Sequence, residues 1–225
     1  MSARSQLEDL VRRFNSPEAP AVDPLWHKDL LDGTNPRHAA VLMLFGVLDN
    51  IPAHSAKYYA PADLDVLLLQ RANTLGDHPG QVAFPGGGID PEDADEVAAS
   101  LREAQEETGL DPSGVQVLGQ LPQVSLPHSN FLVTPVLGWW ASPSPIRVVD
   151  FGESAQVFRV PVRDLLDPEN RVMATLRRGS SVFSSPAFEV NDVLVWGFTA
   201  KLLNQLFDDL GWTVPWDESR VHVVM

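Results

Sequence analysis

The 225-residue chain contains no cysteine, which excludes disulfide bridges, thiolate metal sites and a cysteine nucleophile. Long apolar runs are also missing, since no stretch approaches the roughly 18 uninterrupted apolar residues of a transmembrane helix. The first segment, MSARSQLEDLVRRFNSP, lacks the apolar centre of a secretory signal. We therefore expect a soluble, cytoplasmic protein that has no membrane partner.

Basic residues are scarce. Sixteen Lys and Arg stand against 30 Asp and Glu, which gives a formal charge of −14. This balance argues against a surface for nucleic acid or anionic membranes. A phosphorylated small molecule stays open as a ligand, because divalent metal ions and a few basic side chains can reverse the local field.

A helix with an acidic end is predicted between Asp90 and Gly109. Asp90 is typical of an N-cap, Pro91 of a first helical residue and Gly109 of a C-terminal stop. Asp93 has a position like that of the acidic residue in a capping box. The apolar residues fall on one face, which we expect to be buried: Ala94, Val97, Ala98, Leu101 and Ala104.

The stretch REAQEETG crowds Glu103, Glu106 and Glu107 onto the other face, at the C-terminal end of this helix. Like charges three or four residues apart repel each other, and the negative pole of the helix dipole disfavours them further. A solvated acidic face is the simplest interpretation. The unfavourable position and the preceding FPGGG, whose glycine backbone can approach a ligand closely, favour a group outside the chain that offsets the repulsion.

Six apolar runs have the length of β-strands. They are rich in β-branched and aromatic residues and are bounded by Pro, Ser or Gly. They cover residues 39–48, 65–72, 81–84, 115–121, 131–140 and 155–162. Further along, RVMATL and SSVFSSPAFEV predict a hairpin that turns at RRGS.

Other helices are expected over residues 5–14, before a Pro-rich connection, and in RDLLDPEN. A long one is predicted from Leu194 to Leu210, where apolar residues repeat at helical spacing and stop at Gly211. Strands with two main helices predict an α/β (α+β) fold in which a mixed sheet lies between helices. We expect a lead-in over 1–38, the main domain over 39–210 and an extension of no assigned role over 211–225.

The stretch GGIDPEDADEVAASLREAQEETGL resembles the Nudix box, which reads Gly, five residues, Glu, seven residues, then Arg-Glu-aliphatic-x-Glu-Glu-x-Gly-aliphatic. Residues 102–110 match, with Ala104 as the aliphatic residue. The first Glu of the pattern falls on Ala94, and Asp93 lies one residue earlier. This lengthening resembles the coenzyme A pyrophosphatase branch of the Nudix hydrolase family, and the resemblance implies the Nudix fold.

An upstream motif of that branch resembles LLLQRANTLGDHPGQVAFPGG, residues 67–87. Arg71, Ala72, Gly80 and FPGG are in register. Leu69 replaces a Thr, and Gly76 replaces an Arg whose guanidinium is suited to clamping phosphate, so the substrate stays open. Downstream, LVTPVLG, GESAQVFRVPVRDLLDP and VWGFTAKLL extend the resemblance to residues 39–210.

The resemblance implies metal-dependent hydrolysis of a nucleoside diphosphate derivative, with Mg²⁺ or Mn²⁺ held by oxygen ligands. It makes Glu106 and Glu107 the principal metal ligands and Glu103 a ligand or the base that activates water. It also implies that Arg102 orients these carboxylates through charge-assisted hydrogen bonds. Glu153, in a later loop, is the alternative base, or else a solvated carboxylate.

The residues expected to bind substrate are Arg71, Phe84, Gly86 and Gly87. Arg71 ends an apolar strand, where an ordinary ion pair is nearly as good an interpretation. His78 is more readily explained as a structural loop residue than as a substrate contact. The histidines form no HExxH pattern or ligand-spaced pair, which argues against zinc.

Three functions follow from the resemblance. The first is hydrolysis of coenzyme A or its thioesters to 3′,5′-ADP and 4′-phosphopantetheine. The second is hydrolysis of ADP-ribose, NADH or another nucleoside diphosphate derivative, which Gly76 favours. The third is a non-catalytic nucleotide sensor, against which the intact acidic pattern argues. Because many relatives dimerise, a homodimer is a possible assembly.

Overall fold

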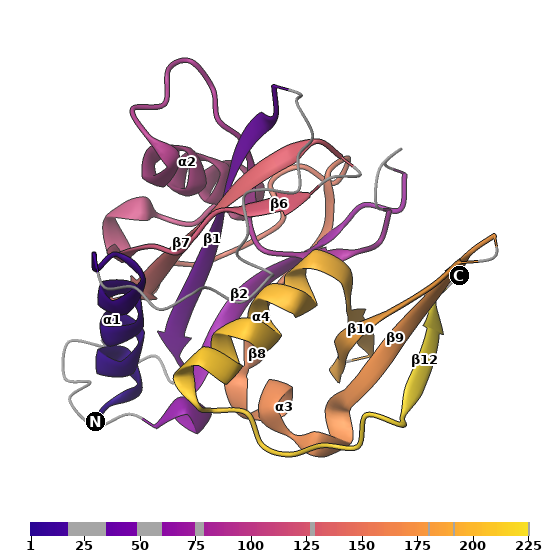
Figure 1. The fold of residues 1–225 in the computed structure, drawn as a ribbon. Coiled ribbons are helices and arrows are strands. Elements are labelled where there is room, and N and C mark those ends of the chain that lie inside the picture. The colour runs from indigo at the N-terminus through magenta and orange to yellow at the C-terminus, as the bar shows by residue number, and fades with distance from the viewer. Residues whose placement is uncertain are drawn as a thin grey trace.

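The computed structural model describes residues 1–17, 35–48, 60–74, 79–126, 129–179, 181–190 and 192–224. Several sequence-based expectations lie outside these ranges: those for Gly76 and His78, and most of the Pro-rich connection. The helices are α1 (Ala3–Phe14), α2 (Glu96–Thr108), α3 (Val162–Leu166) and α4 (Gly197–Leu210), with 3₁₀ turns η4 (Pro61–Asp63), η5 (Pro112–Gly114) and η6 (Pro168–Asn170). They pack with two β-sheets, and the sheet that contains β9, β10 and β12 lies at one side of the molecule (Figure 1).

The large sheet is mixed and has eight strands, in the order β3-β2-β1-β7-β5, with β4 beside β1, β6 beside β7 and β8 beside β2. Its strands are β1 (Arg37–Val47), β2 (Leu64–Arg71), β3 (Val82–Ala83), β4 (Gly86–Gly88), β5 (Val115–Gln120), β6 (Val124–Leu126), β7 (Phe131–Trp140) and β8 (Ser154–Pro161). The central strands β1 and β7 run parallel, and the other pairs are antiparallel. All six predicted strands are confirmed, whereas the short strands β4 and β6 escaped prediction.

The second sheet has four strands in the order β11-β10-β9-β12. The predicted hairpin forms it as β9 (Arg171–Arg178) and β10 (Ser181–Val190), flanked by β11 (Val193–Val195) and β12 (Val221–Val224). The prediction that helix begins at Leu194 is wrong, because Leu194 pairs with Glu189 of β10 and α4 begins only at Gly197.

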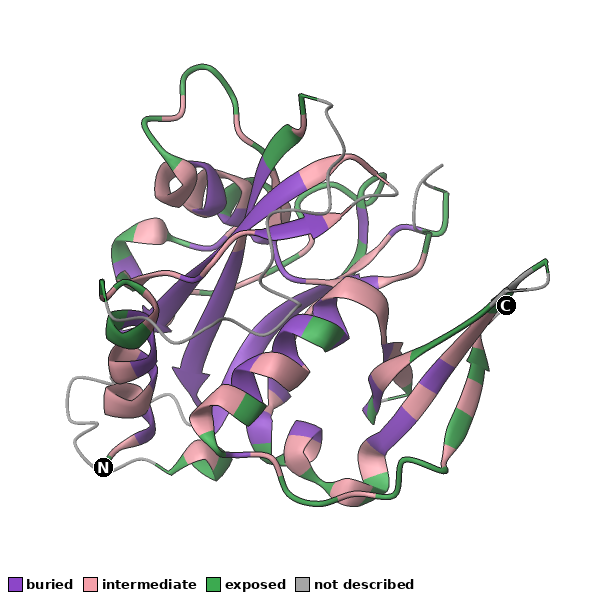
Figure 2. Cartoon of the chain, viewed as in Figure 1, coloured by how far each residue is buried: buried purple, intermediate pink, exposed green. Residues whose placement is uncertain are grey.

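The large sheet lies between helices, which confirms the predicted α/β (α+β) sandwich. Ala104 of α2 packs with Leu42, Leu44 and Trp140 of the sheet on one face. On the other face, α1 and α4 share a second, larger apolar cluster with β1, β2 and β7. The central strands are therefore buried on both sides (Figure 2).

The acidic helix begins later than predicted. Asp95 is the N-cap of α2, and its side chain accepts a hydrogen bond from the Ala98 amide. Asp93 does bind the Asp90 amide as a capping box would (2.9 Å), but within a tight turn that precedes the helix. Ala94 is consequently exposed and not part of the buried face. The predicted stop is confirmed, since Gly109 adopts the left-handed conformation at φ 69°.

Both terminal segments pack against the domain. Leu7 and Leu10 of α1 are 0% and 1% exposed within the larger apolar cluster. The indole nitrogen of Trp212 donates to the Gln6 side chain (2.8 Å), which joins the two ends of the chain. Within the described ranges, no helix is long and apolar enough to cross a membrane.

Replacing Leu7 with Ala should lower the free energy of unfolding by about 2–5 kcal/mol, because the deleted side chain leaves a cavity in a packed cluster. Urea denaturation measures the change. Arg12→Ala, on the exposed side of the same helix, is the matched control and should change it by less than about 0.5 kcal/mol. If the two variants proved equally stable, α1 would not be part of the cooperative unit.

Candidate active site

The predicted acidic residues lie where α2 packs against the glycine strand β4. That strand is held antiparallel to β1, with Gly86 opposite Val41 and Gly88 opposite Ala39. Gly86 has φ +155°, and a Cβ there would lie 2.3 Å from the Ala40 carbonyl oxygen. Only glycine therefore allows β4 to approach β1 so closely and bring its backbone beside α2.

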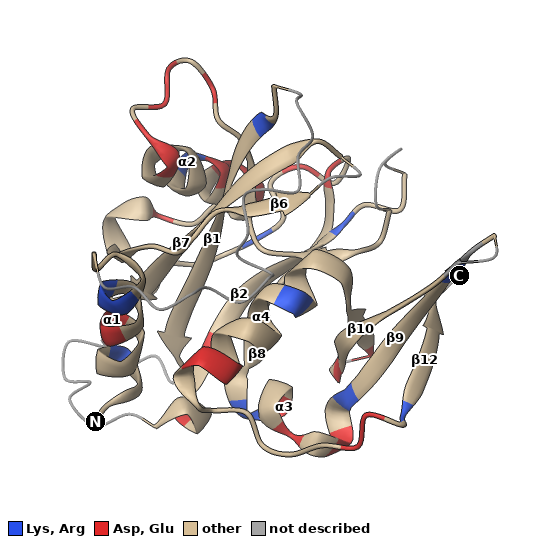
Figure 3. Ribbon diagram, viewed as in Figure 1, with Lys and Arg blue, Asp and Glu red and all other residues tan. Residues whose placement is uncertain are grey.

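Arg102 is the centre of the hydrogen-bond network at this site. Its Nε and Nη2 atoms donate to the two carboxylate oxygens of Asp93, at 3.0 and 2.9 Å, in a bidentate pair. Its Nη1 atom donates to Glu103 (2.9 Å) and Glu106 (3.1 Å). Its Nη2 atom also donates to the Gly88 carbonyl (3.0 Å). Acidic residues gather in and around α2 (Figure 3), and Arg102 partly neutralises their charge from within the chain.

Asp93 was missed as a partner of Arg102 because its apparent role was to cap a helix. The signal was present in the sequence: Asp93 stands one position before the place at which the Nudix pattern has its first Glu. The pair ties the turn that precedes α2 to the middle of the helix. Hydrogen bonding to Arg102 is the main reason that the pKa of Asp93 is lowered.

Glu107 is the most buried of the three helical carboxylates. Burial raises its pKa to about 7, while a hydrogen bond from the Gly86 amide (2.9 Å) and the charge of Arg71 act against this shift. The negative charges of Glu103 and Glu153 raise it further. Burial likewise raises the pKa of Glu103, whereas the Glu106 side chain is 59% exposed.

The structure also brings together site residues from separate segments. The charges of Arg71, at the end of β2, and Glu153, just before β8, both act on Glu107. The Ala72 amide donates to the Glu153 carbonyl (2.8 Å), which holds these two chain segments side by side. Phe84, expected to contact substrate, is 3% exposed and belongs to the larger apolar cluster. Its contact with substrate, like that of Gly86 and Gly87, stays a prediction.

The described residues contain no set of three acidic or histidine side chains that already converge as metal ligands. Arg102 draws Glu103 and Glu106 to itself, and Gly86 binds Glu107. The donor set nevertheless fits a hard divalent cation. Glu103 and Glu107 are carboxylates partly removed from water whose charges oppose each other, and a cation would relieve both penalties.

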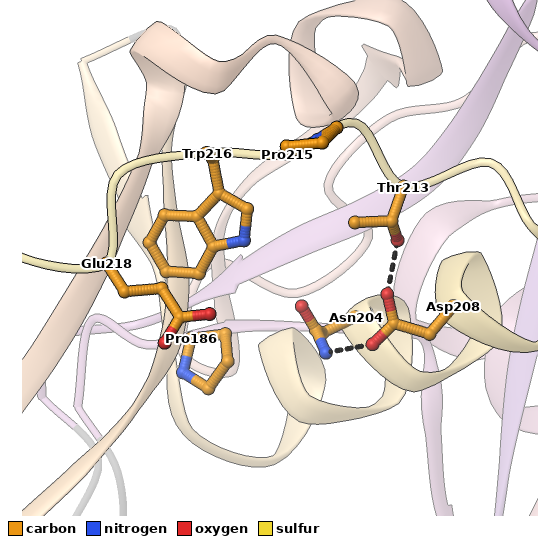
Figure 4. Close-up of a pocket in the computed structure, with 7 residues that line it drawn as sticks. All are labelled: Pro186, Asn204, Asp208, Thr213, Pro215, Trp216 and Glu218. Atoms are coloured by element: carbon orange, nitrogen blue, oxygen red, sulfur yellow. Dashed lines mark hydrogen bonds between the residues drawn. The ribbon is translucent and has the colours of Figure 1, made fainter.

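A cavity of about 310 Å³ lies elsewhere, between α4, β10 and the segment after α4 (Figure 4). It is lined by Pro186, Asn204, Asp208, Thr213, Pro215, Trp216 and Glu218. The Asn204 amide donates to Asp208 (2.8 Å) at its wall. None of the predicted site residues lines this cavity, so it is separate from the acidic site beside α2.

The three neighbouring glycines should respond differently to alanine. A Cβ on Gly87 would lie 2.5 Å from a Glu103 carboxylate oxygen, so Gly87→Ala should displace that carboxylate and weaken Mn²⁺ binding by about tenfold or more, with little loss of stability. Gly86→Ala meets backbone and should lower the melting temperature. Gly88→Ala, with nothing within 4 Å of the added Cβ, is the control and should change neither. Calorimetry of Mn²⁺ binding and thermal melts measure these effects; unchanged Mn²⁺ affinity in Gly87→Ala would contradict the assignment.

Stability of the metal-free protein should depend on the protonation of Glu107. Its folded pKa of about 7 exceeds the ordinary 4.5, so the folded chain binds this proton more tightly than the unfolded chain does. The free energy of unfolding should therefore fall, by up to about 3 kcal/mol, as the pH rises between these values, and stay low above them. Glu107→Gln should remove this dependence.

Urea denaturation in EDTA at several pH values measures this pH dependence of the free energy of unfolding. Glu92→Gln, at an exposed position, is the control that should retain the dependence. Adding Mg²⁺ or Mn²⁺ at pH 8 should restore stability to the wild type more than to Glu107→Gln. A wild-type protein whose stability rises across this pH range, with Glu107→Gln following the same curve, would contradict the burial of this charge.

The chain is similar in sequence to known proteins and in fold to solved structures. Two Salmonella proteins called "Uncharacterized Nudix hydrolase NudL", from Salmonella paratyphi B and Salmonella newport, are each 41% identical over 149 residues, which is 65% of this chain and 75% of theirs. Among solved structures, the Nudix hydrolase RenU of M. smegmatis has 18% identity and a TM-score of 0.49, with 81% of this chain and 91% of that one covered. The NUDIX domain of Shewanella oneidensis NrtR, complexed with ADP ribose, has 18% identity and a TM-score of 0.45, with 93% and 99% covered.

The NUDIX domain family itself matches residues 59–177, which is more than half of the chain and includes the glycine strand, α2 and Glu153. Together with the 41% identity to the Salmonella relatives, this match identifies the chain as a member of the Nudix hydrolase family, and thus as an enzyme of the pyrophosphatase type.

Proposed function

We propose that this enzyme is a metal-dependent pyrophosphatase that hydrolyses the diphosphate of coenzyme A or its thioesters. The observation that carries the proposal is the run of residues 67–87, in which Arg71 and FPGG keep the spacing of the coenzyme A pyrophosphatase motif. Arg71 ends β2 within electrostatic reach of Glu107, so a diphosphate held by this arginine would lie against the acidic helix.

Glu103, Glu106 and Glu107 would hold Mg²⁺ or Mn²⁺, with the backbone of Gly86 or Gly87 as a further oxygen donor. When bound, the ion neutralises charge on the diphosphate oxygens and lowers the pKa of water. Rigid helical geometry suits this task, because α2 fixes all three carboxylates relative to β4. Arg102 orients Glu103 and Glu106 through hydrogen bonds from its Nη1 atom.

In the reaction, water attacks one phosphorus and the bridging P–O bond breaks. One phosphate gains the hydroxyl group and the other retains the bridging oxygen, so the products are 3′,5′-ADP and 4′-phosphopantetheine or its acylated form. A base takes the proton from the attacking water. Glu103 and Glu153 are both candidates; Glu153 is exposed and its charge reaches Glu107, so it has access to solvent and to the acidic site.

The second candidate function is hydrolysis of ADP-ribose, NADH or another nucleoside diphosphate derivative. It is favoured by Gly76, which stands where the coenzyme A motif has an arginine. Membership of the Nudix hydrolase family argues against the third expectation, a non-catalytic sensor. The proposal also includes a cytoplasmic location and leaves a homodimer as a possible assembly.

Glu106→Gln and Glu107→Gln should each reduce turnover at least about a hundredfold, because each removes a charged oxygen ligand. Both variants should retain the wild-type circular dichroism spectrum. Glu92→Gln, on the exposed turn before α2, serves as the control that keeps full activity. Unchanged turnover in either helical variant would refute the metal-ligand roles.

The substrate is tested by incubating the purified protein with coenzyme A, an acyl-coenzyme A, ADP-ribose and NADH, each with Mg²⁺ and with Mn²⁺. Mass spectrometry of the products should give 3′,5′-ADP as the major product, with coenzyme A or its thioester turned over most efficiently. Preferential formation of AMP from ADP-ribose or NADH would favour the second function. Binding without any product would favour the sensor.

A further inference from the structure

A β-bulge lies beside the acidic site, between strands β2 and β8. The two strands pair regularly from Asp65 opposite Pro161 to Gln70 opposite Gln156, and then Arg71 faces Ser154 instead of Ala155. The extra residue on β8 reverses the side to which Ser154 would otherwise point. Directly paired residues of antiparallel strands project from the same face, so the bulge sets the Ser154 hydroxyl on the side of Arg71.

Both residues of this pair carry a buried polar atom with no hydrogen-bond partner among the described residues: Nε of Arg71 and Oγ of Ser154. Ser154 is 1% exposed, so bulk solvent does not reach its hydroxyl. Unpaired buried polar atoms are costly and uncommon in folded proteins. The two atoms are also complementary, because the Arg71 Nε–H is a donor and a serine oxygen accepts.

The pair is joined to the acidic site. The Glu153 carbonyl accepts from the Ala72 amide, next to Arg71, and Ser154 follows Glu153 directly. The Ser154 amide in turn donates to the Asp150 carbonyl (3.0 Å), which fixes the start of β8. The end of β2 and the loop before β8 therefore lie side by side, and the charges of Arg71 and Glu153 reach the carboxylate of Glu107.

We infer that Ser154 is a positioning residue for Arg71: its hydroxyl oxygen accepts the Nε–H of Arg71 when a diphosphate is bound. This inference rests on the proposed function. Fixing Nε leaves the two terminal nitrogens of the guanidinium free to bind two phosphate oxygens as a fork. This position therefore needs a side chain with a hydroxyl oxygen that accepts a hydrogen bond, and the bulge places that hydroxyl on the side of Arg71.

A serine that only fills space would behave differently. Its replacement would change the melting temperature without changing ligand affinity, and its effect would not depend on the identity of residue 71. A positioning serine loses its influence when Arg71 is replaced by lysine, whose side chain has no equivalent of Nε–H. A double-mutant cycle over the two residues separates the cases.

The test measures the affinity of the wild type, Ser154→Ala, Ser154→Thr, Arg71→Lys and the double variant Arg71→Lys/Ser154→Ala. Titration calorimetry uses coenzyme A and, separately, ADP-ribose, in Ca²⁺, which takes oxygen ligands and gives a readout of binding without relying on turnover. Steady-state kinetics in Mg²⁺ supplies KM and kcat. Ser125→Ala, a buried serine on β6, is the matched control.

We expect Ser154→Ala to raise the dissociation constant and KM by about ten- to a hundredfold, as the loss of one hydrogen bond to a charged group does, with kcat changed by less than about twofold. Ser154→Thr, which keeps the hydroxyl, should remain within about twofold of the wild type. In the Arg71→Lys background, Ser154→Ala should add less than about twofold. Ser125→Ala should change none of these values.

Equal affinity of Ser154→Ala and wild type would overturn the inference, as would a full additional loss in the Arg71→Lys background. Failure of the proposed function is distinct: the wild type would then bind coenzyme A or ADP-ribose but release no hydrolysis product, and the affinity cycle would still decide the role of Ser154. A wild type that bound neither compound would overturn both.

Discussion

The acidic site at the end of α2 depends on one guanidinium. Arg102 is held by a bidentate pair with Asp93 and reaches Glu103 and Glu106 with its remaining donors, so a loop, a glycine strand and a helix are joined through a single side chain. Without it, the acidic end of α2 would combine mutual repulsion with an unfavourable helix dipole. Arg102 reduces the repulsion among the carboxylates of the folded chain, and the carboxylates themselves remain charged. They can therefore still bind a cation.

The fold adds a second constraint, because it buries Glu107 against the glycine backbone. A carboxylate in that position can bind a proton or a metal ion, since either neutralises a charge that is partly removed from water. The glycine strand supplies one amide and leaves no room for a side chain at Gly87. The same three-residue strand, β4, thus packs against β1 and contacts the carboxylates that are expected to bind metal.

The sequence predicted the long elements because their patterns are local. Strand-length apolar runs, the stop at Gly109 and the acidic turn of α2 all have the predicted places. Features that depend on partners distant in the chain escaped prediction. Leu194 is apolar at helical spacing, yet its pairing with Glu189 makes it a strand residue. Phe84 belongs to an apolar cluster built from residues far apart in the chain, and the Arg71–Ser154 pair arises from a bulge that no local pattern reveals.

The parallel pairing of β12 with β9 makes β12, and not β9, the edge strand of the second sheet. Val221 to Val224 cover an edge that β9 would otherwise present, and β12 becomes the outermost strand. Val221 and Val223 are 58% and 60% exposed on it. An uncovered edge with apolar side chains is a template for strand addition by other chains. Shortening the chain before Val221, or fusing a bulky tag to that end, would therefore alter solubility during expression before it altered chemistry at the distant carboxylates.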